Sequence, residues 1–252
     1  MKNNFKMLKC LLLIISFFSF PIKSRAIVIR HDKPDRKYQE LATKYAASIV
    51  YFDGCVGTIV APRWIITAKH CFEGLTDELS DPLKLESLLV EHLGRKYPAR
   101  KVIFHPQADI ALVELLFSPE DARSVKLYPK QDEKGMIVTF IGNGGFGNGE
   151  MGLTKYDQIK RAAINKVEKV DQSWIYFNFD RPPKALELEG ISGPGDSGGP
   201  ALIEQDNEVF ILGVSSGQEN NGVEGVYGVK EYYARISTYL DWIEQTMQKS
   251  TD

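Results

Sequence analysis

The sequence predicts an all-β protein with one helix at its C-terminal end. Short apolar runs rich in β-branched residues recur along most of the chain, and turn-forming residues separate them. Many short strands punctuated in this way are typical of antiparallel barrels or sandwiches. Near the end the spacing becomes helical, because Ile236, Leu240, Ile243 and Met247 fall on one face of a helix.

Ten runs of strand length follow one another along the chain. They lie at residues 47–52, 57–61, 64–67, 100–104, 110–115, 136–142, 159–167, 173–179, 209–215 and 226–229. Pairs such as Asp53-Gly54, Ala61-Pro62 and Asn148-Gly149 lie between them and favour turns. The polar segment 128–135 is the best internal boundary. We therefore expect a first unit over residues 27–130 and a second over 131–252.

Residues 1–26 have the pattern of a cleaved secretory signal. Three lysines precede an apolar stretch at 11–20, and the small residues Ser24 and Ala26 occupy positions −3 and −1 of a cut after Ala26. The stretch is shorter than the ~20 residues that span a bilayer. We expect a secreted or periplasmic protein without a stable membrane anchor; an uncleaved anchor is the minor alternative.

Composition and charge exclude two classes of protein. The hydrophobic content of 43% argues against a disordered chain. Loss of residues 1–26 removes five of the 31 basic residues and no acidic one, which leaves 26 basic against 33 acidic residues and a net charge of −7. Such a chain is not expected to bind nucleic acid.

The segment Gly195-Asp196-Ser197-Gly198-Gly199-Pro200 carries the strongest chemical signal. Glycines allow backbone N–H groups to come close to a reacting carbonyl, as an oxyanion site requires. A serine is a weak nucleophile unless a base lies within hydrogen-bonding reach. The position of the histidines therefore decides how this segment is interpreted.

All four histidines, at positions 31, 70, 92 and 105, precede Ser197. This order excludes the α/β-hydrolases, in which the histidine follows the serine. His70 comes directly after a strand-like run, and Asp109 begins another. The order His70, Asp109, Ser197 is the order found in the chymotrypsin type of serine peptidase. His31, His92 and His105 have no comparable context, and we predict no metal site.

Three separated motifs, TAKHC around His70, DIALVEL from Asp109 and GDSGGP around Ser197, identify the resemblance. The chain resembles chymotrypsin/trypsin-family serine peptidases of a bacterial, disulfide-poor kind, over nearly all of its mature length. This resemblance implies two six-stranded antiparallel β-barrels of chymotrypsin type, followed by the C-terminal helix. The active site would lie between the barrels.

The resemblance also implies a role for each residue. Ser197 would attack the carbonyl, His70 would take its proton, and Asp109 would hold the imidazole. The backbone N–H groups of Gly195 and Ser197 would bind the oxyanion. No cofactor is implied.

Two cysteines remain after Cys10 leaves with the signal. The family has a disulfide around its histidine loop at this spacing, so we expect a bond between Cys55 and Cys71. An even number of cysteines suits an exported protein.

In activatable family members the residue matching Asp196 pairs with a new N-terminal ammonium group. A cut after Ala26 would expose Ile27 directly. We expect Ile27 to pair with Asp196 after signal cleavage, without a separate propeptide. The residues Ile29-Arg30 depart from the two glycines usual in the family; processing after Arg25 and an internal cation for Asp196 are the alternatives.

The resemblance assigns substrate binding to Ser215, Ser216 and Gly217, whose backbone would pair with the substrate. Ser216 replaces an aromatic residue usual in the family, and Lys69 replaces a small alanine before the histidine. We expect Lys69 to point to solvent, the alternative being a position near Asp109.

The specificity pocket is expected to include Ile191, Ser192 and Gly225. Ile191 lies six residues before Ser197, where trypsin-like enzymes have an aspartate for basic side chains. An apolar floor favours aromatic or large aliphatic substrate residues. A shift in the alignment of this loop would instead place Glu189 in the pocket, and Glu219 or Glu224 could also reach it. Specificity for Arg and Lys is therefore the alternative.

The leading hypothesis is a secreted, monomeric serine endopeptidase that acts on proteins or peptides. A catalytically weak or inactive homologue that serves as a secreted binding protein is the first alternative. An esterase using the same three residues is the second.

Overall fold

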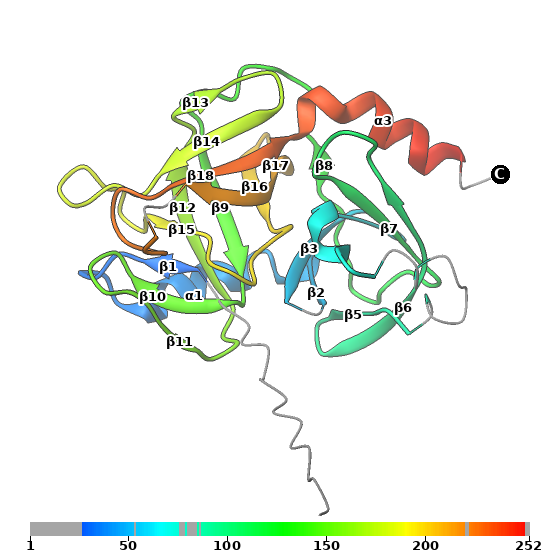
Figure 1. Ribbon diagram of the computed structural model, residues 1–252. Helices are drawn as coiled ribbons and strands as arrows, with labels where there is room; N and C mark the ends of the chain where they lie inside the picture. Colours follow the sequence, from blue (N-terminus) through cyan, green and yellow to red (C-terminus); the bar gives the residue numbers. More distant parts are fainter. Residues whose placement is uncertain are drawn as a thin grey trace, which may run out of the picture.

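A computed structural model describes residues 27–52, 54–75, 79, 85, 87–219 and 222–249. The expected signal segment and Cys10 lie outside these residues. Figure 1 shows two β-rich halves side by side, with the C-terminal helix running from the second half over the first. The expected all-β class and C-terminal helix are confirmed.

The first half is a closed barrel of six antiparallel strands. Around the barrel their order is β2-β3-β4-β7-β6-β5. The strands are β2 (Ile49–Phe52), β3 (Cys55–Ala61), β4 (Trp64–Thr67), β5 (Leu89–His92), β6 (Arg95–Phe104) and β7 (Ala111–Leu115). Strand β4 is buried on both faces. Ile65 packs inside the barrel, and Trp64 and Ile66 join the cluster shared with the C-terminal helix.

The main sheet of the second half is open in its strand pairing. Its order is β12-β9-β16-β17-β18-β14-β13, with β8 (Lys126–Leu127) paired to β17. These strands are β9 (Ile137–Gly142), β12 (Arg161–Lys166), β13 (Lys169–Val170), β14 (Trp174–Asn178), β16 (Pro200–Gln205), β17 (Glu208–Glu219) and β18 (Lys230–Arg235). The second unit is therefore a half-barrel sheet rather than a closed six-stranded ring.

A smaller sheet completes this half, in the order β11-β10-β1-β15. Its strands are β1 (Val28–Ile29), β10 (Gly145–Asn148), β11 (Gly152–Tyr156) and β15 (Gly190–Ile191). The first strand of the described chain thus lies among strands of the second half. Helix α1 (Asp35–Thr43) follows it and packs on β12, where the buried Arg161 pairs with Asp35 and Asp157.

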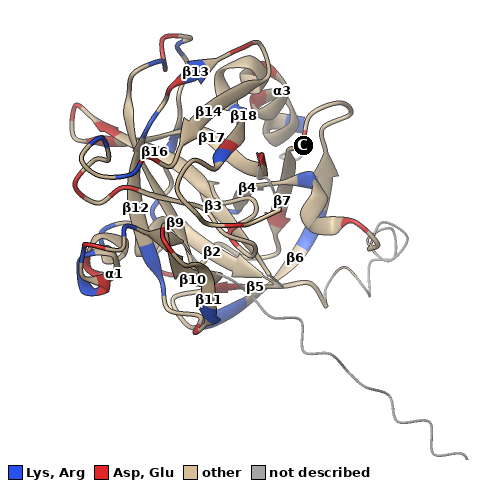
Figure 2. Ribbon diagram, turned by 60° about the vertical axis from the view of Figure 1, so that its left-hand side comes forward, with Lys and Arg blue, Asp and Glu red and all other residues tan. Residues whose placement is uncertain are grey.

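Helix α3 (Ile236–Lys249) joins the two halves. Its buried Ile243 belongs to the same cluster as Trp64 and Leu112 of the first barrel. Figure 2 shows the charged residues mostly on loops, strand ends and the helices. Within the described residues, no helix is long and apolar enough to cross a membrane.

One predicted strand is placed differently. Residues 226–229 form a turn region, and β18 begins at Lys230 instead. Strand β18 pairs with β14 on one side and β17 on the other, with Gln218 opposite Glu231. The apolar residues at 226–229 suggested a strand there, whereas pairing with β14 and β17 places the strand at Lys230–Arg235.

Candidate active site

His70 lies on the short 3-10 helix η2 (Lys69–Phe72), directly after β4. The expected disulfide is present: Cys71 is bonded to Cys55 at the start of β3, with a Cα–Cα distance of 6.2 Å. Thr67 donates a hydrogen bond of 2.8 Å to the carbonyl of Val56. The turn that carries His70 is therefore attached to β3 both covalently and by a buried hydrogen bond.

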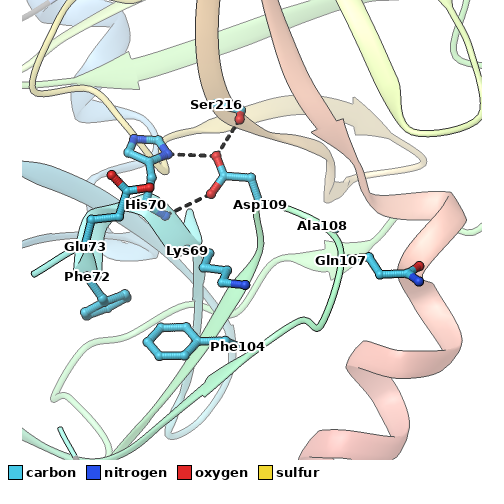
Figure 3. Close-up of a pocket in the computed structure, with 9 residues that line it drawn as sticks. All are labelled: Lys69, His70, Phe72, Glu73, Phe104, Gln107, Ala108, Asp109 and Ser216. Atoms are coloured by element: carbon cyan, nitrogen blue, oxygen red, sulfur yellow. Dashed lines mark hydrogen bonds and ion pairs between the residues drawn. The ribbon is translucent and has the colours of Figure 1, made fainter. Parts of the chain in front are cut away.

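Asp109 holds His70 at two points. The Oδ2 atom lies 2.7 Å from His70 Nδ1, and Oδ1 accepts a 2.9 Å hydrogen bond from the backbone N–H of His70. Ser216 of β17 donates a third hydrogen bond to Oδ2 (Figure 3). The imidazole orientation is thus determined by a carboxylate that the second half of the molecule also contacts.

These contacts set the charge states of the pair. The hydrogen bond with Asp109 raises the pKa of His70 above its ordinary value, although burial opposes this change. Burial raises the pKa of Asp109, but hydrogen bonds from His70 and Ser216 outweigh it, so this pKa is lowered. Asp109 therefore stays ionised, and the neutral imidazole beside it has an increased affinity for a proton.

His105 supports the loop that presents Asp109. Its Nδ1 accepts hydrogen bonds from the backbone N–H groups of Gln107 and Ala108, at 3.1 and 2.7 Å. Burial, together with the charge of Lys69, lowers the pKa of His105, which favours the neutral ring that can accept these bonds. Sequence analysis gave His105 no role, although the two N–H groups that it accepts from lie only two and three residues further along the chain.

Two aromatic rings of α3 cover His105. The centroids of Tyr239 and Trp242 both lie 4.8 Å from its ring centroid. Lys69, which we expected to point to solvent, is partly buried and donates a hydrogen bond of 3.5 Å to the carbonyl of His105. Lys69 and Asp109 line the same cleft beside His70 (Figure 3). The volume of this cleft is about 430 Å³.

Ser197 is held close to the first barrel through its own backbone. Its carbonyl accepts a 2.8 Å hydrogen bond from the N–H of Val56. The next residue, Gly198, has φ +78°, and a Cβ there would overlap Thr67 Oγ1 and the Val56 carbonyl. The glycine after the serine is therefore needed for the close approach of the two halves.

The backbone around Ser197 leaves two donors unused. Gly195 has φ +97°, and neither its N–H nor that of Ser197 donates a hydrogen bond within the described residues. Within the same residues, Ser197 Oγ makes no hydrogen bond with His70. Such bonds are often long before substrate binds.

Asp196 is buried beneath this loop, with 1% of its surface exposed. It accepts hydrogen bonds from the N–H groups of Gly193 and Gly144, at 2.9 and 3.0 Å. Burial raises its pKa to about 8, although backbone hydrogen bonds oppose the change. Ile27 is equally buried, and packs with Phe140 of β9, while Asp196 contacts Gly142 on the same strand.

A separate pocket of about 210 Å³ opens beside Ser197. Four residues expected to bind substrate line it, namely Ser192, Ser215, Ser216 and Gly217. Ile191 and Gly225 are not among its lining residues. Ile191 is fully buried in a cluster with Val28, Phe179 and Val229, and a Cβ on Gly225 would press against Val28.

Sequence analysis missed Gln218, which lines this pocket, and Glu231, which lies behind its lining residue Ser192. Gln218 lines the pocket and donates to the carbonyl of Ser192. Glu231 on β18 is fully buried and accepts hydrogen bonds from the N–H and the hydroxyl of Ser192. The pairing of β18 with β17 places Glu231 opposite Gln218. Sequence analysis could have found Glu231 only if it had placed this strand at Lys230–Arg235 instead of at residues 226–229.

The described residues contain no cluster of three or more potential metal-ligating side chains.

Comparison with known proteins identifies the family of this chain. The family model named Trypsin matches residues 34–243. The chain belongs to the trypsin family. An uncharacterized peptidase of Corynebacterium glutamicum strain R is 31% identical to this trypsin-family chain over 193 residues, 75% of this chain and 62% of that protein. A putative peptidase of C. glutamicum strain ATCC 13032 is 31% identical over 194 residues, with the same two shares.

Human serine protease 56 is more distant, with 24% identity over 214 residues, which cover 78% of this chain. The match covers 62% of the length of each bacterial relative and 35% of the human protein. These relatives support a trypsin-family serine peptidase domain in this chain.

Proposed function

We propose that this trypsin-family chain is an exported, monomeric serine endopeptidase whose catalytic residues are His70, Asp109 and Ser197. The observation that supports this most directly is the two-point contact of Asp109 with His70, beside a Ser197 loop tied to the same barrel. His70 takes the proton of Ser197 Oγ as the hydroxyl attacks the peptide carbonyl. It then returns the proton to the leaving amine.

The unused N–H groups of Gly195 and Ser197 stabilise the oxyanion of the tetrahedral intermediate. Loss of one such donor typically costs ~2.7–4 kcal/mol of transition-state stabilisation. Water then attacks the acyl-enzyme with His70 as the base, and the acid product leaves.

The substrate backbone extends along β17 at residues 215–217. The pairing of β17 with β18 shifts register between Ser215 and Gly217, which leaves Ser216 outside the ladder. Backbone groups at this irregular position are available to a substrate that adds as a further strand.

Signal cleavage after Ala26 generates the active form in this proposal. Ile27 and Asp196 are both buried and contact the same strand β9. Removal of the preceding segment creates an ammonium group at Ile27. Its pairing with the buried Asp196 would compensate a carboxylate that otherwise has only backbone donors among its hydrogen-bond partners in the described residues.

The decisive experiment is the substitution Ser197→Ala. We expect kcat for a peptide amide to fall by roughly 10⁶-fold, as for other serine-histidine pairs. Ser118→Ala, at an exposed serine of the first half, is the matched control and should retain activity. Near-normal amide hydrolysis by the Ser197→Ala protein would reject the proposal.

Two further measurements separate the alternatives. Labelling by a fluorophosphonate that depends on Ser197 distinguishes a peptidase from an inactive binding protein. Turnover of an ester without turnover of the matching amide would instead indicate an esterase.

A further inference from the structure

We propose that Glu231 is the acidic specificity residue of the pocket beside Ser197, and that the peptidase cleaves after Arg and Lys. This inference rests on the proposed function and identifies the substrate side chain that the pocket accepts. It replaces the apolar preference expected from Ile191 with a preference for a cation.

The pocket floor is polar because two serines line it. Ser192 and Ser215 both face the pocket, with their hydroxyl oxygens 3.4 Å apart. Glu231 lies behind Ser192 and accepts hydrogen bonds from the N–H, at 3.0 Å, and from the hydroxyl of that residue. A cationic side chain that reaches these hydroxyl groups would therefore meet a carboxylate directly behind them.

The other oxygen of this carboxylate has no hydrogen-bond partner. Glu231 is fully buried, and its Oε1 is one of three buried side-chain atoms left without a partner within the described residues. A buried ionised carboxylate is costly unless a cation or several donors compensate it. A guanidinium or ammonium group in the pocket supplies the missing charge and donors.

Other acids near the pocket fit this role less well. Glu189 is buried, but its two oxygens accept hydrogen bonds from the backbone N–H groups of Asp180 and Leu186. Glu219 is exposed at the end of β17. Glu224 lines the pocket but is only half-buried, so its charge is better screened by water than that of Glu231.

The titration of Glu231 supplies an independent signature. Burial raises its pKa to about 8; the hydrogen bonds from Ser192 and the nearby amide of Gln218 oppose this change, and the charge of Asp196 adds to it. A cation binds the ionised form better, so binding releases a proton. The affinity for a cation should increase as pH rises toward 8 and level off above it.

Four groups face Glu231, three from neighbouring segments and one from its own strand. Ser192 and Asp196 come from the loop before the serine, Gln218 comes from β17, and Tyr233 from β18 itself. Asp196 is the second acid of this set, so every protein that is tested retains Asp196 and has the same N-terminal residue.

The first experiment uses the mature protein with unmodified Glu231. Peptide substrates that differ only in the residue before the scissile bond carry Arg, Lys, citrulline or Phe. Citrulline has the shape of Arg without its charge. We expect kcat/KM for Arg to exceed that for citrulline by about 10- to 100-fold, the range for a buried charge-assisted contact. Equal cleavage after Arg and citrulline, or preferred cleavage after Phe, would overturn the inference.

The second experiment compares Glu231→Gln with Glu219→Gln as the matched control. Glu231→Gln should lower kcat/KM for Arg by about 10- to 100-fold and leave Phe unchanged or improved. Glu219→Gln should change neither. An equal loss on Arg and Phe substrates would show a structural role for Glu231 and contradict the inference.

A binding measurement keeps this inference separate from the proposed chemistry. The probe p-aminobenzamidine is titrated by fluorescence into the Ser197→Ala protein, with and without Glu231→Gln, between about pH 6 and 9, a range that brackets the raised pKa of Glu231 of about 8. We expect binding that tightens toward alkaline pH and is lost in Glu231→Gln. Binding unaffected by Glu231→Gln overturns the specificity residue, whereas the catalytic proposal depends only on the loss of turnover in Ser197→Ala.

Discussion

The carboxylate of Asp109 fixes the position of His70 and changes its pKa. It bonds both the ring and the backbone of His70, so the imidazole cannot rotate without losing its 2.7 Å contact with Oδ2, while the 2.9 Å bond holds the backbone in place. The same bonds raise the pKa of His70 and lower that of Asp109. An ionised acid beside a strengthened neutral base is the state that proton transfer from a serine requires.

The pH dependence of hydrolysis tests this pair. Because His70 must be neutral to accept a proton and its pKa is raised, the acid limb of kcat/KM should lie above the ordinary value of ~6.5. Asp109→Asn should lower kcat about 10⁴-fold and move the limb to lower pH. Glu73→Gln, which removes only a nearby charge, should move the limb slightly in the same direction. A limb unchanged in Asp109→Asn would contradict the assignment.

Residues with a local motif were recognisable before the fold was known. His70, Asp109 and Ser197 each lie in a short segment with a characteristic pattern, and the structure brings these segments together. Glu231 lies between Lys230 and two tyrosines, with no such pattern. Its position depends on the β17–β18 register, which no local signal specifies.

At the scale of elements, the turn η2 depends on its connection to β3. The Cys55–Cys71 bond closes a loop with a sequence separation of 16 residues, which contains all of β4. The bond restricts the unfolded chain, and it also holds the residue next to His70 in place.

Loss of this bond should be costly. The double substitution Cys55→Ser with Cys71→Ser should lower the free energy of unfolding by ~3 kcal/mol, the chain-entropy value for a loop of this length. Urea denaturation followed by tryptophan fluorescence, with and without reductant, measures the change. A midpoint that neither reductant nor the double substitution shifts would contradict a stabilising disulfide.

Strand β18 and helix α3 show where element prediction reached its limit. The helix follows from apolar residues at helical spacing, and it is present. The strand predicted at 226–229 was wrong, because the apolar run there forms a turn and the more polar run that follows lies between two partner strands. Tertiary pairing outweighs local propensity in such a strand.

Two segments, β1 and α3, each pack against the half of the molecule that lies farther from them in the sequence. Strand β1 lies between β10 and β15 of the second half, and α3 packs against the first barrel. The expected domain boundary at residue 130 stays a prediction. Strand β1 precedes this boundary but pairs with strands of the second half, and α3 follows it but packs against the first barrel.

The N-terminal segment connects processing to activity in our proposal. N-terminal sequencing of the exported protein should find Ile27, and a form that retains Ala26 should have little activity. Pairing with Asp196 raises the pKa of the Ile27 ammonium above its unfolded value of ~8. The pairing is complete below that unfolded value and is lost as pH rises through the folded value, so activity should decline at alkaline pH.

An active protein that begins at any other residue would contradict this prediction. Asp196→Asn provides a second measurement, because it removes the charge that the ammonium requires while leaving the fold of the first barrel intact. Its kcat should fall, and the alkaline decline should no longer follow titration of the N-terminal group.

The sequence by itself determined the fold class, the C-terminal helix and the candidate residues His70, Asp109 and Ser197. Strand periodicity and short motifs are local, so they are readable without coordinates. Only the tertiary structure decided that the second sheet stays open, that α3 covers His105, and that Glu231 lies beneath the pocket beside Ser197. These features depend on strand register and on contacts between segments far apart in the chain, which the chain specifies only when all of it packs together.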